Sequence, residues 1–193
     1  LKFYLPMERS VIDAGQYFQK SKVIQITYVR DVMMFGKHFN KSITYLFFFF
    51  LFLVFLDQLT KDLVINKLEL YESKNLLPFL NFTFVVNYGF AFGFLNSPSL
   101  NQLIVSLVIL SIILYFLYLL IKTQDYIFRF SLVLILSGAL GNFLDRIIRG
   151  FVIDFIDIYI SDYHWPAFNL ADSWITIGFM ILIMNILFLN KKI

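Results

Sequence analysis

The chain has 193 residues, of which 60% are hydrophobic, 20% aromatic and 15% charged, with a formal net charge of +3. Soluble domains are about 45–50% apolar and about 25% charged, so this composition is typical of a protein that uses the lipid bilayer as its solvent. The absence of cysteine excludes disulfides, a thiol nucleophile and a thiolate metal site. His38 and His164 lack the HExxH spacing of zinc hydrolases, and the basic residues gather at segment ends, unlike a nucleic-acid-binding face. We expect no metal, no cofactor and no nucleic-acid partner.

Residues 1–42 are polar and mixed in charge, and we interpret them as an N-terminal cytoplasmic extension of undetermined structure. A four-span membrane domain, residues 43–190, follows. A membrane-spanning helix needs about 20 mostly apolar residues. Segments that meet this condition are Ile43–Leu56, which Asp57–Leu68 can extend, Leu100–Ile121, Ser131–Leu144 and Ala171–Leu189.

The basic residues predict which side of the membrane each loop faces. They lie before span one, around the turn between spans two and three, and after span four, which places them all on one side of the membrane: Lys37, Lys41, Lys122, Arg129, Lys191 and Lys192. Because such residues mark the cytoplasmic side, we expect both termini inside and the loops 62–99 and 146–170 outside.

Polar residues that are costly at membrane depth gather at the outer ends of these spans. They are Asp57, Asn142, Asp145, Arg146, Asp154, Asn169 and Asp172. Ionisable residues in such places are functional candidates by default, and several at one leaflet predict a single site.

The end of the first span and the loop after it contain two weaker signals. Asp57 and Lys61 are four residues apart and can pair on one helix face, although an ordinary interfacial ion pair would look the same. Phe82, Phe84 and Val86 alternate with other residues, which favours an extended segment over a helix. Residues 87–93 then read as a glycine-containing turn, and a simple extracellular hairpin would also explain them.

The end of the third span carries small residues followed by polar ones. Gly138 and Gly141 allow close helix packing, which is a sufficient explanation for them. The spacing of Asn142, Asp145 and Arg146 places them on neighbouring turns, facing one pocket. Because adjacent helix residues do not face each other, Asp145 and Arg146 each need another partner.

Two further acids are candidates for catalysis. Asp154 lies between Ile153 and Phe155, an apolar setting that raises the pKa of a carboxyl. Asn169 or Asp172 could cap the fourth helix, but capping does not account for Asp154. Two carboxyls forced together cannot both ionise, so one keeps a proton while the other acts as a base. Such a pair can activate a water molecule to attack a peptide bond.

Five motifs occur in order: DQLTK (57–61), NYGFAFGFL (87–95), GNFLDR (141–146), GFVIDFID (150–157) and FNLADS (168–173). Together they resemble the lipoprotein signal peptidase (signal peptidase II) family over residues 43–190. The resemblance implies a mainly α, polytopic membrane protein with four transmembrane helices and a small extracytoplasmic β-sheet between spans one and two. It also implies a monomeric aspartic endopeptidase of the bacterial inner membrane, contacting membrane lipids, with its site near the outer leaflet.

By the same resemblance, the enzyme cuts diacylglyceryl-modified prolipoproteins just before the lipidated cysteine. Asp154 and Asp172 take the catalytic positions. The resemblance assigns supporting or substrate-binding roles to Asp57, Lys61, Asn87, Gly93, Asn142, Asp145, Arg146, Asn169 and Ala171.

Two other functions were weighed against a protease. A small proton-coupled transporter also needs buried acids, but these acids cluster at one leaflet instead of lining a path across the membrane. A non-catalytic membrane scaffold would leave the paired acids without a purpose.

Overall fold

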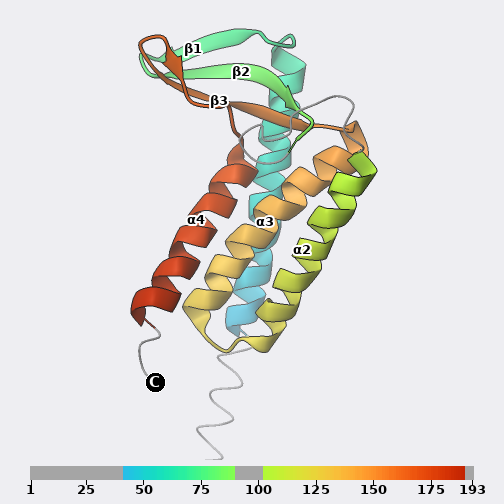
Figure 1. The fold of residues 1–193 in the computed structure, drawn as a ribbon, viewed down its shortest axis with the longest axis vertical. Coiled ribbons are helices and arrows are strands. Elements are labelled where there is room, and N and C mark those ends of the chain that lie inside the picture. Colours follow the sequence, from blue (N-terminus) through green and yellow to red (C-terminus); the bar gives the residue numbers. More distant parts are fainter. Residues whose placement is uncertain (1–40, 90–101, 190–193) are drawn as a thin grey trace, which may run out of the picture. The chain divides into compact units, whose positions relative to one another are not determined.

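The computed structural model describes residues 41–89 and 102–189, so almost all of the predicted extension, and Gly93, lie outside the described residues. Four helices in the described part are long and apolar enough to cross a membrane (Figure 1). They are Lys41–Lys67, α2 (Gln102–Lys122), α3 (Tyr126–Arg149) and a last helix, Leu170–Phe188. The last helix consists of α4 (Leu170–Met184) and most of a π-helical end, η2 (Asn185–Leu189). The four predicted spans are therefore confirmed.

The helix ends follow from local capping. Asp125 precedes α3 and accepts a hydrogen bond from the backbone N–H of Phe128 over 2.7 Å, so α3 begins before Arg129 instead of after it. Arg129, expected in the preceding turn, thus lies in the first turns of α3. Gly150 ends α3 in the left-handed conformation, with φ of 80°, which glycine adopts without steric cost.

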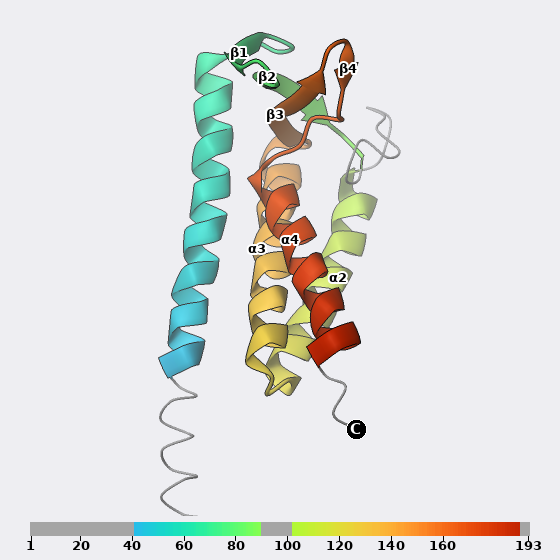
Figure 2. The same cartoon turned by 90° about the vertical axis from the view of Figure 1, so that its left-hand side faces the viewer.

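A small antiparallel sheet draws its strands from two loops. β1 (Ser73–Leu77) and β2 (Leu80–Asn87) follow the first helix, as the alternating pattern predicts. β3 (Val152–Ile160) and β4 (Tyr163–His164) come from the loop between α3 and α4, which the sequence did not predict. The order in the described residues is β1-β2-β3-β4 (Figure 2). The pairing of β2 with β3 places Asn87 beside Val152, at the end of β3 nearest α3.

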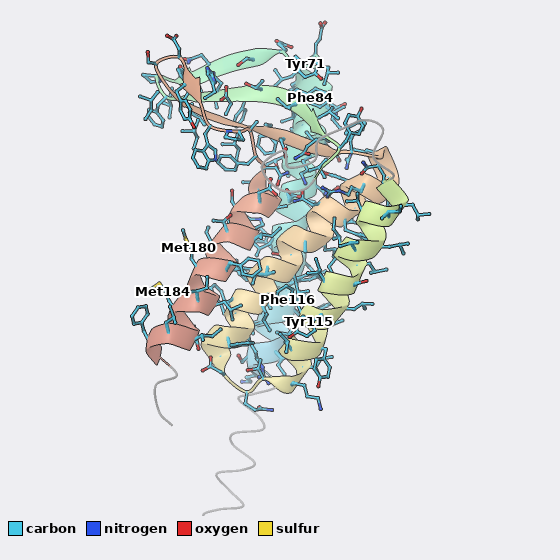
Figure 3. All side chains as sticks on the ribbon, in the orientation of Figure 1. Tyr71, Phe84, Tyr115, Phe116, Met180 and Met184 are labelled. Carbon is cyan, nitrogen blue, oxygen red and sulfur yellow. The ribbon has the colours of Figure 1, made fainter. Side chains whose placement is uncertain are left out.

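The third helix, α3, is the most buried of the described helices and packs against both α2 and α4. A Cβ atom on Gly138 would collide with the backbone oxygen of Ala171, so this glycine permits the close approach of α3 and α4. The outer faces carry exposed apolar side chains, among them Tyr115, Met180 and Met184 (Figure 3). Such faces suit contact with lipid tails.

Candidate active site

The predicted site residues come from three helices (Lys41–Lys67, α3 and α4) and two strands (β2 and β3), and they meet where the sheet contacts the helix ends. Those inside the described residues are all buried: Asp57, Lys61, Asn87, Asn142, Asp145, Arg146, Asp154, Asn169, Ala171 and Asp172. Each of them hydrogen-bonds to another residue of this region, as described below. The remaining prediction, Gly93, lies outside the described residues.

Asn169 connects the two candidate catalytic aspartates. As the N-cap of α4, its Oδ1 accepts from the backbone N–H of Asp172 over 2.9 Å, and its own N–H donates to Asp172 Oδ2 over 3.3 Å. This is a reciprocal capping box. Its Nδ2 donates to Asp154 Oδ1 over 2.7 Å. The capping role considered for Asn169 and Asp172 is thus present, and the same cap reaches Asp154.

Two more asparagine amides hold the other carboxylate oxygens. Asn87 Nδ2 donates to Asp154 Oδ2 over 2.9 Å, at the end of β2. Asn142 Nδ2 donates to Asp172 Oδ1 over 2.8 Å, from α3. Because every oxygen of both carboxyls accepts a hydrogen bond, the orientation of the pair is fixed before any ligand arrives.

Asp154 lies in β3, outside the spans, and its acidity is strongly altered. Burial, together with repulsion from the neighbouring Asp172, raises the pKa of Asp154 to about 7. The hydrogen bond from Asn87 and the charge of Lys61 act in the opposite direction. A carboxyl with a pKa near 7 can hold or release a proton at neutral pH, as acid–base catalysis requires.

A buried cation supports this region from the first helix. Lys61 Nζ lies 2.8 Å from Asp57 Oδ2 and 2.8 Å from Asp145 Oδ2, so the predicted Asp57–Lys61 pair is present. It also donates to Asn142 Oδ1 over 3.0 Å. Asp57 Oδ1 accepts from the backbone N–H of Ala171 over 2.9 Å. These contacts tie the first helix to α3 and to the start of α4.

Two residues in this network were not predicted. Gln58 Nε2 donates to Asp57 Oδ2, to the backbone oxygen of Gly141 and to Asp145 Oδ1. Arg149 Nη1 donates to Asp145 Oδ1 over 2.5 Å and to Gln58 Oε1 over 3.2 Å. The four-residue spacing of Asp145 and Arg149 could have revealed this pair, whereas no sequence signal marks Gln58.

A cavity of about 230 Å³ adjoins Asp172 of the carboxyl pair. Its polar lining consists of Asn87, Asn142, Arg146 and Asp172, and its apolar lining includes Ile109, Ile112 and Phe116 of α2 with Ile175 and Phe179 of α4. Arg146 Nη2 donates to the backbone oxygen of Gly89 and Nη1 to that of Asn142. Its Nε is buried without a hydrogen-bond partner among the described residues. The cavity can therefore take a ligand that is polar at one end and apolar at the other.

Comparisons with known proteins identify the family of the chain. Residues 49–188 match the family described as Signal peptidase (SPase) II. The chain is 45% identical to the lipoprotein signal peptidase of Alteromonas mediterranea over 134 residues, covering 67% of this chain and 73% of that protein. It is 44% identical to the lipoprotein signal peptidase of Francisella tularensis subsp. novicida over 140 residues, covering 70% and 87%.

The fold also matches a solved structure. A bacterial membrane enzyme structure at 2.3 Å resolution superposes with a TM-score of 0.69 and 33% identity, covering 77% of this chain and 93% of that one. A second bacterial membrane enzyme structure gives a TM-score of 0.66 and 34% identity. The chain therefore belongs to the signal peptidase II family of bacterial multi-pass membrane proteins, and it is a lipoprotein signal peptidase of the aspartic class.

Proposed function

We propose that Asp154 and Asp172 form the catalytic dyad of this peptidase. The observation that carries the proposal is that both carboxyls are buried, held by asparagine amides and joined through Asn169. With one member ionised and the other protonated, the ionised carboxylate takes a proton from water as that water attacks the scissile carbonyl carbon. The protonated carboxyl donates to the carbonyl oxygen or to the departing nitrogen.

Arg146 is the group best placed to stabilise the negative charge of the tetrahedral intermediate. Its guanidinium lines the same cavity as Asp172, and its buried Nε has a donor proton to offer. A fixed cation in a site shielded from water stabilises such charge more strongly than water does. Asn87, Asn142 and Asn169 keep the carboxyls in place while the charges change.

The substrate that fits this site is a diacylglyceryl-modified prolipoprotein, cut just before the lipidated cysteine. The cavity joins polar groups beside Asp172 to apolar side chains of α2 and α4, matching a peptide with lipid chains attached. Membrane anchoring of both partners confines the scissile bond to the depth of the dyad, which raises its effective concentration.

The orientation in the bacterial inner membrane follows from the charges. Lys122 ends α2, whereas the opposite end of α2 hydrogen-bonds to the site through Gln102 and Tyr88. Because basic residues mark the cytoplasmic side, the dyad lies near the outer leaflet and both termini are cytoplasmic. One chain supplies every dyad contact described above, so a monomer is sufficient for the proposed chemistry.

Cleavage of one precursor with and without its diacylglyceryl group tests the substrate assignment. The purified protein in detergent should cut the modified form, with product masses that place the cut before the modified cysteine, and should leave the unmodified form intact. Equal cleavage of both forms, or a cut elsewhere, would contradict the assignment.

A further inference from the structure

The buried part of the network next to the dyad is short of one positive charge. Asp57, Lys61 and Asp145 have fully buried side chains, and both carboxylates contact the same ammonium at 2.8 Å. A buried carboxylate without its own counter-charge is unstable, so one lysine cannot balance both.

Arg149 supplies the second cation from the end of α3. Its Nη1 lies 2.5 Å from Asp145 Oδ1, and its Nη2 lies 2.5 Å from Asp62 Oδ1 on the first helix. The Arg149 side chain is 16% exposed and that of Asp62 is 56% exposed, so the guanidinium bridges from the interior to the surface. Because Arg149 Nη1 contacts Asp145 Oδ1, the other carboxylate oxygen, Oδ2, is available to Lys61.

The same lysine determines how an amide faces the dyad. Lys61 Nζ donates to Asn142 Oδ1, which fixes the side of the amide that bears the oxygen. The Asn142 Nδ2 is thereby turned to Asp172 Oδ1, 2.8 Å away. A second donor, Asn169 Nδ2, lies 3.2 Å from the same Oδ1. A lysine drawn away from Asn142 would therefore leave this amide with one of its two orienting contacts.

From this chain of contacts we propose that Arg149 is a positioning residue for the dyad: by neutralising Asp145, it keeps Lys61 on Asn142 and so keeps Asn142 on Asp172. The proposal rests on the dyad assignment made above. Without Arg149, Asp145 and Asp57 compete for Lys61, the ammonium moves toward Asp145, and the positive charge near the dyad weakens.

Loss of Arg149 also changes the pKa of Asp154 in a definite direction. The charged groups around Arg149 and the dyad are Asp57, Lys61 and Asp62 on the first helix, Asp145 and Arg146 on α3, Asp154 on β3 and Asp172 on α4. The charge of Lys61 lowers the pKa of Asp154. Withdrawal of Lys61 therefore raises the pKa of Asp154, and the pH at which the dyad carries a single proton moves upward.

The test compares Arg149→Gln and Arg149→Lys with Lys74→Gln, which removes an exposed positive charge on β1 as a control. The protonation of Asp154 is followed by its carboxyl C=O infrared band, assigned by its loss in Asp154→Asn.

In Arg149→Gln the titration should move up by about one pH unit, a tenfold change in the protonation equilibrium. The kcat for cleavage should fall about tenfold with little change in KM, since only orientation is lost. Arg149→Lys should retain most of both properties, and Lys74→Gln should match the wild type.

A double variant separates neutralisation of Asp145 from a direct effect of the Arg149 charge. Removing Asp145's charge as well, in Arg149→Gln/Asp145→Asn, leaves Lys61 with one carboxylate and should return the infrared titration toward that of the wild type. If Arg149→Gln is too unstable to purify, Arg149→Met, which also removes the charge, takes its place and should show the same upward shift. An unshifted titration in Arg149→Gln, with lower thermal stability alone, would reduce Arg149 to a structural role. The two proposals can fail separately. If the titration shifts in Arg149→Gln but the wild type itself does not cleave the modified prolipoprotein, the positioning role is supported and the proposed catalysis is refuted.

Discussion

Asn169 and Asp172 cap each other at the start of α4, each accepting a hydrogen bond from the other's backbone N–H. The cap that begins the last membrane helix is therefore also part of the candidate active site. Because Asn169 reaches Asp154 through Nδ2 and Asp172 through its backbone N–H and Oδ1, helix capping and dyad alignment can be separated by the choice of substitution.

Asn169→Ser and Asn169→Ala should differ in stability but share a loss of activity. Serine retains an N-cap oxygen, whereas alanine does not, so Asn169→Ala should be less stable than Asn169→Ser by about 1 kcal/mol. Both lose the donor to Asp154, and both should lower kcat by about 10²-fold or more, as loss of preorganised positioning does. Thermal unfolding and cleavage rates check the two parts, and full activity in Asn169→Ser would argue against the bridging role.

The raised pKa of Asp154 predicts how stability depends on pH. An Asp in an unfolded chain has a pKa of about 3.9, while burial raises that of Asp154 to about 7. The folded state thus binds the proton more tightly, and the stability gained from protonation is complete below about pH 4 and lost as the pH rises through 7. Thermal unfolding in detergent should show this decline, and Asp154→Asn should be less pH-dependent and more stable than the wild type at pH 8. Parallel pH curves for the two proteins would contradict the raised pKa.

Lys61→Met should be one of the most destabilising single changes in the chain. It leaves Asp57 and Asp145 buried without their shared cation, and removal of one partner from a buried ion network costs about 3–5 kcal/mol. Lys67 lies exposed near the end of the same helix, so Lys67→Met should change stability by less than about 0.5 kcal/mol. Chemical unfolding in detergent gives the comparison, and similar losses for the two variants would contradict the structural role of Lys61.

Alanine substitutions at two glycines should have different effects on stability and activity. A Cβ on Gly138 would collide with the backbone oxygen of Ala171 and approach Ile175 Cγ1 to 2.8 Å, so Gly138→Ala should displace α4 and lower both stability and cleavage. Gly150→Ala has nothing within 4 Å, and its only cost is the positive φ of 80°. That variant should lose about 1–2 kcal/mol of stability and keep its kcat. The two variants are distinguished by measuring activity at a temperature where both are folded.

The sequence predicts the helices well because their signal is local. Runs of about 20 apolar residues and the basic residues at their ends identify all four spans, and the boundaries differ where caps such as Asp125 decide them. β3 was missed because its apolar run is buried in the sheet and so lacks the alternation of a half-exposed strand. Its place beside β2 depends on pairing across more than 60 residues, which no local pattern reveals.

The candidate site residues were found through unexpected polarity and through family resemblance, but most of their partners were not. The spacing of Asp57 and Lys61 predicts their pair, but it does not show that Lys61 also contacts Asp145. The exchange of hydrogen bonds among Asn87, Asn142 and Asn169 depends on three segments meeting in space. Gln58 lies at a helix surface where polar residues are ordinary, so only the fold shows that it contacts Asp145. The contact of Arg149 with Asp145 is indicated by their four-residue spacing, although nothing in the sequence marks it as part of the site.

The central claim, that Asp154 and Asp172 carry out the hydrolysis, is tested most directly by cleavage of a diacylglyceryl-modified prolipoprotein with three Asp→Asn variants. Asp157 is the matched control, because it lies three residues from Asp154 on β3 and contacts Asn81 and His164 instead of the dyad. We predict that Asp154→Asn and Asp172→Asn, folded in detergent, give no detectable cleavage while Asp157→Asn keeps most of the wild-type rate. Near-normal cleavage by either dyad variant would contradict the assignment.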